Sequence, residues 1–200
     1  MHYFRLETLG DTNNDKFCFI GSSPEEMGLE DYYPAKGKKL GSKYPPVASI
    51  YLQDKYPGFR LSSLIGTIKS YLIVHRDMKD VIEAHCPGVE IEYLPFTLYN
   101  HKKRVHSQDY FIVNPIGGLD VLDLKASVIK YLDAPGDPYH GAVVDVKKFV
   151  LDGEKVQHAP ALFRVKEYPS EYFINETLAN AFKERQFTNV VLEEIEVTRR

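Results

Sequence analysis

The chain has 200 residues, of which 44% are hydrophobic and 26% are charged, as in an ordinary globular protein. Its formal net charge of −3 is too small to indicate general affinity for nucleic acids or membranes. No apolar run approaches the roughly 20 residues of a membrane-spanning helix, and the first residues lack the pattern of a secretion signal. We therefore expect a cytoplasmic protein in which Cys18 and Cys86, far apart and flanked by apolar residues, are buried free thiols.

The first 60 residues predict short strands separated by turns. Residues 1–9 and 17–20 are expected to form strands, and Ser22-Ser23-Pro24 followed by acids has the pattern of a helix start. Residues 36–46 are basic and rich in Gly and Pro, which fits either a linker or a surface loop. We expect residues 1–60 to be a β-rich segment of the same domain as an α+β region over residues 61–200.

A strand–helix–strand unit follows. Residues 71–74 predict a strand, and apolar residues from Met78 to Ile82 recur at helical spacing until Cys86-Pro87-Gly88 ends the helix. Ion pairs Arg76–Asp80 and Lys79–Glu83 are expected on its outer face. Residues 89–94 alternate strictly, which predicts a strand with its acids facing water.

The same unit recurs near the C-terminus. Residues 172–174 predict a strand, Asn175 a helix cap, and residues 190–195 another strand. Leu178 and Phe182 repeat Met78 and Ile82 at an offset of 100 residues, and the following strand is offset by 101. Both an internal duplication and convergent packing account for this echo.

The region between the two units is predicted to be rich in strands. Residues 96–99 and 110–113 flank a polar, basic segment and predict a hairpin with a long tip. Asp152-Gly153 predicts a hairpin turn before a strand over residues 161–165. Asp120 and Asp123 are expected to flank a helix start leading into residues 126–129. Mixed strands with two main helices indicate the α+β class.

The sequence contains few residues arranged for catalysis. Seven histidines are present, but no HExxH, HxH or Cys/His cluster, and His75 and His85 lie on different faces of one helix. There is no nucleophile elbow and no phosphate-binding loop. Asp120 and Asp123 could act as an acid–base pair or hold a cation, but a structural role is the preferred interpretation. We therefore assign no catalytic, cofactor-binding or metal-binding residue.

Exposed side chains remain as candidates for binding another macromolecule. The basic hairpin tip could contact phosphate or be a solvated turn, and tyrosines suit partner surfaces as well as half-buried strands. The C-terminal acids, with Glu90 and Glu92, could form an acidic face that mimics nucleic acid if the two echoing strands lie near each other. A solvated sheet face is the alternative. The candidate contact residues are Tyr32, Tyr33, His101, Lys102, Lys103, Arg104, Glu193, Glu194 and Glu196.

Residues 61–197 resemble the eleventh immunity family of bacterial polymorphic-toxin systems. Four stretches carry the resemblance in order: 71–74 with its helix, 92–96, 110–114 leading to 119–123 and Ser127, and 162–164 followed by the helix from Glu176 to Arg185. The family tends to place Ser before each helix, where this chain has His75 and Asn175. Because His caps poorly, we expect the first helix to begin one or two residues later. Residues 1–60 carry little of the resemblance and are expected to vary with the partner.

The resemblance implies a cytoplasmic protein that blocks one toxin by direct binding. Such a toxin is often nuclease-like and delivered by a contact-dependent or type VI secretion system. The family implies no catalytic residues. From the composition and the lack of motifs we also expect no cofactor, no metal, and no membrane or nucleic-acid partner. Two alternatives stay open: a structural subunit of a secretion assembly, and a small metal-dependent hydrolase that uses Asp120, Asp123 and a nearby histidine.

Overall fold

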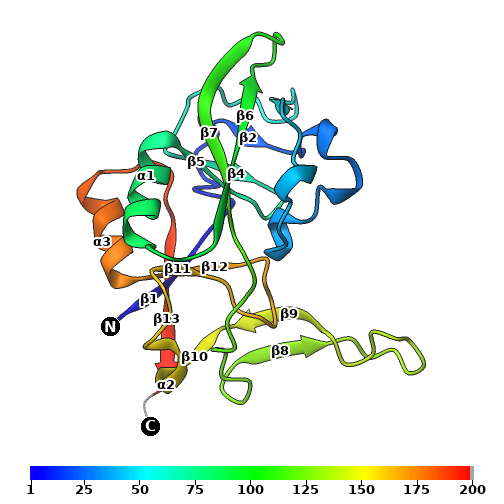
Figure 1. Ribbon diagram of the computed structural model, residues 1–200, viewed down its shortest axis with the longest axis vertical. Coiled ribbons are helices and arrows are strands. Elements are labelled where there is room, and N and C mark those ends of the chain that lie inside the picture. Colours follow the sequence, from blue (N-terminus) through cyan, green and yellow to red (C-terminus); the bar gives the residue numbers. More distant parts are fainter. Residues whose placement is uncertain (199–200) are drawn as a thin grey trace.

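The computed structural model describes residues 1–198, which form two β-sheets, a separate two-stranded ribbon and three α-helices (Figure 1). The six-stranded sheet has the order β2 (Phe19–Ile20), β4 (Leu64–Thr67), β5 (Leu72–His75), β7 (Val105–Pro115), β6 (Ile91–Tyr99) and β3 (Ser49–Tyr51). The five-stranded sheet has the order β10 (Val150–Asp152), β13 (Leu192–Thr198), β1 (Tyr3–Leu6), β12 (Tyr172–Asn175) and β11 (Leu162–Phe163). The ribbon pairs β8 (Val128–Tyr131) with β9 (Val143–Lys148).

The helices are α1 (Arg76–His85), α2 (Gly153–Val156) and α3 (Glu176–Glu184), with short 3₁₀ turns at Glu25–Glu30, Pro34–Lys36 and Gly41–Lys43. No helix within residues 1–198 is long and apolar enough to cross a membrane. The combination of mixed sheets with a few helices confirms the predicted α+β class.

The two sheets repeat one arrangement. The elements β3, β4, β5, α1 and β6 occur in this order along the chain, as do β10, β11, β12, α3 and β13, with the short helix α2 inserted after β10. The strand pairings match as well: β4–β5 and β11–β12 are antiparallel, whereas β3–β6 and β10–β13 are parallel. The middle strand differs in origin, because β7 follows β6 in a hairpin whereas β1 comes from the other end of the chain. The sequence echo at an offset of 100 residues therefore reflects a structural repeat.

The central core lies between the sheets and around the two long helices. α1 and α3 pack against each other (Figure 1), and their apolar residues Met78, Ile82, Leu178 and Phe182 share one cluster with residues of both sheets. A second cluster covers the other face of the six-stranded sheet and a third the other face of the five-stranded sheet. Cys18 and Cys86 are buried free thiols, as predicted.

The first long helix begins earlier than predicted, whereas the second begins where it was expected. Nδ1 of His75 accepts a hydrogen bond from the backbone N–H of Asp77 (3.3 Å), so α1 begins directly after His75 and not later. Asn175 caps α3 as predicted, since its side-chain oxygen accepts from the N–H of Leu178 at 3.0 Å. Both caps satisfy an amide that the helix itself leaves unpaired.

Two ion pairs of α1 were predicted, and only one of them is formed. The expected pair between Lys79 and Glu83 is present. Arg76 pairs instead with Asp109 on β7 at 2.8 Å, so its predicted pairing with Asp80 is wrong. A carboxylate on a neighbouring strand takes the place of the one on the next helical turn.

Three predicted aspartate and serine roles also need correction. Asp152 caps α2 by accepting from the N–H groups of Glu154 and Lys155, so Gly153 starts a helix and not a hairpin turn. The turn after Asp123 leads into strand β8 and not into a helix. The first 3₁₀ turn begins after Pro24 without a side-chain cap, so the expected serine cap is not formed.

Arg164, just after β11, joins the two halves of the fold. Its side chain is buried, with 1% of the residue exposed. The guanidinium donates to the carbonyl oxygens of Pro34 (2.5 Å), Pro115 (3.1 Å) and Pro169. It also donates to the hydroxyl of Tyr172 at 2.7 Å, and that hydroxyl accepts from the N–H of Leu72 on β5. One side chain therefore links the N-terminal segment, β7 and β12.

Candidate protein interface

The hairpin formed by β6 and β7 projects beyond the sheet that carries it (Figure 1). Its tip, residues 100–104, is closed by backbone hydrogen bonds between Asn100 and both Lys103 and Arg104. The side-chain oxygen of Asn100 also accepts from the N–H groups of Lys102 (2.9 Å) and Arg104 (3.1 Å). The tip therefore has a defined conformation.

Two histidines fix the hairpin to the loop between β3 and β4. Nε2 of His101 bonds the carbonyl oxygen of Tyr56, and Nε2 of His106 bonds that of Phe59, each at 2.9 Å. A carbonyl oxygen can only accept, so each Nε2 carries a proton. The loop is held in turn by the carbonyl oxygen of Lys16, which accepts from the N–H groups of Phe59 and Arg60.

These bonds bring three distant segments into one exposed surface, which we call the hairpin face. It consists of Lys16, Lys55, Phe59, Arg60, Leu61, Lys102, Lys103, Arg104 and Val105, all of them exposed. Its three apolar members have high exposed fractions: 70% for Phe59, 56% for Val105 and 36% for Leu61. Of its residues, Lys16, Phe59, Arg60 and Leu61 line a shallow hollow together with His106.

The cations of the hairpin face have no carboxylate partners. Within residues 1–198, none of its six Lys and Arg side chains forms an ion pair. Two of them pack on rings instead: Arg60 lies 5.5 Å from the centre of the Phe17 ring and Lys55 lies 5.4 Å from that of Tyr56. Asp15 and Asp54 are the exposed acids next to them in the sequence.

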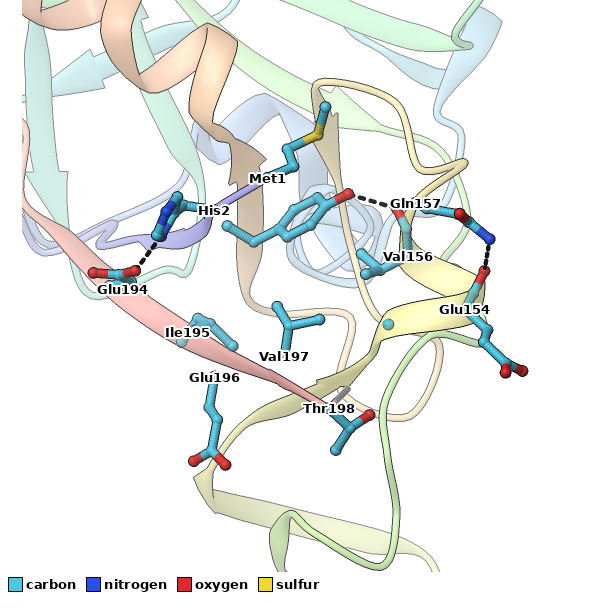
Figure 2. A pocket seen from close by; sticks show the side chains of 12 residues that line it. Met1, His2, Glu154, Val156, Gln157, Glu194, Ile195, Glu196, Val197 and Thr198 are labelled. Carbon is cyan, nitrogen blue, oxygen red and sulfur yellow. Dashed lines mark hydrogen bonds and ion pairs between the residues drawn. The ribbon is translucent and has the colours of Figure 1, made fainter. Parts of the chain in front are cut away.

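The corresponding end of the five-stranded sheet is an open pocket of about 690 Å³ (Figure 2). It is lined by the start of the chain with β1, by α2 and by the end of β13. The hydroxyl of Tyr3 donates to the carbonyl oxygen of Val156 at 2.8 Å, as that of Tyr110 donates to Ser62 at 2.7 Å in the other sheet. The pocket thus lies at the end of β13 and β1 that corresponds to the hairpin end of β6 and β7.

The predicted contact acids lie on β13, and each has a basic partner. Glu193 pairs with Arg5 at 2.7 Å, Glu194 with Nδ1 of His2 at 2.5 Å, and Glu196 with Lys148 at 2.7 Å. Glu194 and Glu196 line the pocket, and Figure 2 shows His2 beside Glu194. Arg5 and Lys148 therefore offset the charge of Glu193 and Glu196, and the carboxylate of Glu194 is engaged by the His2 ring.

The acids near β6 belong to a different surface. Glu90 pairs with Lys39 at 2.7 Å. Glu92 was expected to face water, but its carboxylate accepts from the backbone N–H groups of Leu40 and Gly41. Because β6 and β13 are in different sheets, the acids of the two echoing strands do not line one sheet face.

Tyr32 and Tyr33 lie in a third part of the fold, between the first two 3₁₀ turns. Their rings meet edge to face with centres 5.0 Å apart. Nζ of Lys38 lies 5.0 Å from the Tyr32 ring centre, and Nζ of Lys43 lies 5.4 Å from that of Tyr33. The three predicted groups of contact residues therefore come from three separate elements.

The arrangement offers little for catalysis. No group of three or more His, Cys, Asp or Glu side chains in the described part of the chain is placed to hold a metal ion. Asp120 pairs with Lys155 at 3.0 Å. The exposed loop residues Phe59, Arg60 and Leu61 were not among the predicted contact residues, because only the tertiary fold brings them to the hairpin tip.

Comparison with known proteins gives one family match. The model of the Immunity protein family (Imm11) matches residues 30–197. No curated protein matches the chain. The match covers most of the sequence, including α1, α3 and every strand of both sheets except β1 and β2. The chain therefore belongs to the immunity protein family Imm11, whose members are inhibitors of toxins and not enzymes.

Proposed function

We propose that this protein binds one cognate bacterial toxin and neutralises it inside the cell that produces both. The observation that carries the proposal is the family match over residues 30–197. The fold is consistent with it: a scaffold with three apolar clusters presents a projecting hairpin held by hydrogen bonds. Tight inhibitors gain affinity from such preorganised surfaces, because little conformational entropy is lost on binding.

The finer proposal concerns the toxin and the compartment. The toxin is an effector of a polymorphic-toxin system, of the nuclease type and delivered by contact-dependent or type VI secretion, and it is blocked in the cytoplasm. The immunity protein protects the producing cell in competition between bacteria. Neither nucleic acid nor membrane takes part in the binding.

Co-expression tests the proposal. The toxin domain encoded next to this gene is induced in a sensitive host, with and without the immunity protein. We expect growth to be rescued and the two proteins to co-purify, whereas an unrelated toxin should kill the host in both cases. The proposal is lost if the purified protein does not bind this toxin and the toxin still kills in its presence.

The compartment is tested with two versions of the toxin. One version remains in the cytoplasm and the other carries an export signal, while the immunity protein has none. Rescue from the cytoplasmic version alone supports the proposed location. Rescue from the exported version, at equal toxicity, contradicts it.

A further inference from the structure

We propose that the hairpin face is the surface that docks the toxin, and that it takes a protein surface with acidic side chains around an apolar centre. This inference rests on the proposed function and adds the location and chemistry of the contact. It selects one of the three surfaces that carry the predicted contact residues. The selection follows from charge, from exposed apolar groups and from the anchored conformation of the hairpin tip.

Charge compensation distinguishes the hairpin face from the end of β13. Glu193 and Glu196 each have a Lys or Arg nitrogen at 2.7 Å, and Glu194 has Nδ1 of His2 at 2.5 Å. The six cations of the hairpin face have no such partner within residues 1–198, although the whole chain has a net charge of −3. Uncompensated charge of one sign attracts a partner of the other sign and raises the rate of association.

Exposed apolar side chains favour a protein partner over a nucleic acid. Phe59 and Val105 keep more than half of their surface in water, and Leu61 about a third. An aromatic anchor surrounded by charged groups is the pattern of binding hot spots in protein interfaces. A nucleic-acid duplex would use the cations but would leave these three side chains without an apolar counterpart. A single strand could stack a base on Phe59, but it would leave the aliphatic Leu61 and Val105 uncovered.

The hairpin tip has a fixed shape in which it can meet a partner. His101 and His106 anchor it to the neighbouring loop, and the side chain of Asn100 accepts from two amides of the tip. Such preorganisation reduces the conformational entropy that is lost on binding.

The first experiment reverses the charge of the tip. The variant Lys102→Glu/Lys103→Glu/Arg104→Glu is compared with Lys125→Glu/Lys130→Glu/Lys147→Glu, which changes the net charge equally at exposed positions of the ribbon region. Binding kinetics are measured with the purified toxin domain encoded by the adjacent gene. We expect the tip variant to associate at least about tenfold more slowly at low salt, and the control variant to stay within about twofold of wild type.

The second experiment removes the apolar anchor. Phe59→Ala is expected to weaken binding by about 30-fold, mainly through faster dissociation. Leu29→Ala, which truncates a residue that is 90% exposed outside the hairpin face, should leave affinity unchanged. Circular dichroism and melting temperature of all variants should match wild type, since every altered side chain is exposed.

The outcomes separate this inference from the proposed function. If wild type does not bind the toxin domain, the proposed function fails. If wild type and both hairpin-face variants bind it equally well, the function stands and the docking surface lies elsewhere. A short DNA duplex and a short single-stranded RNA serve as further probes. If the tip variant lost binding to these probes at physiological salt while binding the toxin normally, the hairpin face would be a nucleic-acid site, and the inference would be overturned.

Discussion

Arg164 is a charged residue held in the interior by neutral partners. Its donors bond the carbonyl oxygens of three prolines and the hydroxyl of Tyr172, and its Cζ lies 4.0 Å from the Tyr172 ring centre. Burial lowers the pKa of the guanidinium, and Tyr172 counteracts this effect. Because the partners come from three regions of the chain, the side chain contributes to the relative placement of both sheets.

We expect Arg164→Met to lower the free energy of unfolding by about 3 kcal/mol or more, since several buried carbonyl oxygens lose their donor. Urea denaturation followed by circular dichroism measures the change. The matched control is Lys166→Met, two residues further along the chain and exposed, which should change stability by about 0.5 kcal/mol at most. Equal stability of the two variants would show that Arg164 is not a structural link.

Glu171 is a second residue whose environment opposes its charge. Burial raises the pKa of its carboxyl above the ordinary value of 4.5; Arg5 acts against this, whereas Glu7 and Glu193 add to it. The folded state therefore binds the proton more tightly than the unfolded state. As the pH rises from about 4.5 through the folded-state pKa, this carboxyl makes the protein progressively less stable.

Glu171→Gln should therefore raise the melting temperature at neutral pH, and the gain should disappear as the pH falls below about 4.5. Thermal unfolding of wild type and variant over this pH range tests the prediction. Asp54→Asn, at an exposed loop position, is the control and should give no pH-dependent gain. A loss of stability at neutral pH would contradict the prediction.

At the scale of elements, the sequence pattern predicted those helices and strands whose formation depends mainly on neighbouring residues. The helical spacing after His75 and Asn175 predicted α1 and α3, and the alternation of residues 89–94 predicted the first part of β6. The hairpin was predicted as well, but its expected long tip is wrong: β7 already begins at Val105, because residues from there onward pair with β6. Asp152-Gly153 matches the sequence of a common hairpin turn, but the side chain of Asp152 accepts from the N–H groups that follow and caps a helix. A two-residue turn motif does not predict which neighbouring backbone N–H groups will need a hydrogen-bond acceptor.

The candidate site was only partly predictable for the same reason. The tip residues 101–104 could be singled out because the flanking strands leave them exposed. Phe59 and Leu61 could not, since they reach the tip through the bond between His106 and the Phe59 carbonyl, across 47 residues of sequence. The partners of Glu193, Glu194 and Glu196 are likewise distant in sequence. An acidic face was therefore expected on a strand whose acids in fact contact basic side chains.

The cap of α3 gives a prediction at this scale. Asn175→Ala should lower the free energy of unfolding by about 1 kcal/mol, because the N–H of Leu178 loses its acceptor. Asn180→Ala, at an exposed position inside the same helix, is the control and should be neutral or slightly stabilising, since Ala is the better helix former. Chemical denaturation of both variants measures the difference, and a larger loss for Asn180→Ala would refute the capping role.

At the scale of the whole molecule, the N-terminal segment is part of both sheets. β1 lies between β12 and β13, while β2 and β3 form the two edges of the six-stranded sheet. We propose that residues 1–60 belong to the same domain as residues 61–200. The proposal predicts that the segment cannot be removed without loss of the second sheet.

Deletion of residues 1–6 should therefore abolish cooperative unfolding, because β12 and β13 lose the strand that pairs with both. Deletion of residues 134–139 removes the same number of residues from the loop of the β8–β9 ribbon, and this control should still unfold in one transition. Urea titration with two spectroscopic probes distinguishes the cases. A cooperative transition without residues 1–6 would indicate that the N-terminal strand is dispensable.

The central position of β1 also sets the order in which a ribosome can complete the fold. Tyr3–Leu6 leave the ribosome well before their partners on β13, which lie within Leu192–Thr198. At synthesis rates of about 5 to 20 residues per second, the strand waits roughly 10 to 40 s for this partner. The six-stranded sheet can assemble from residues 19–115 while the chain is still growing, whereas the five-stranded sheet cannot. A chain halted before residue 192 would leave β1 unpaired on one side, as a substrate for chaperones and proteases.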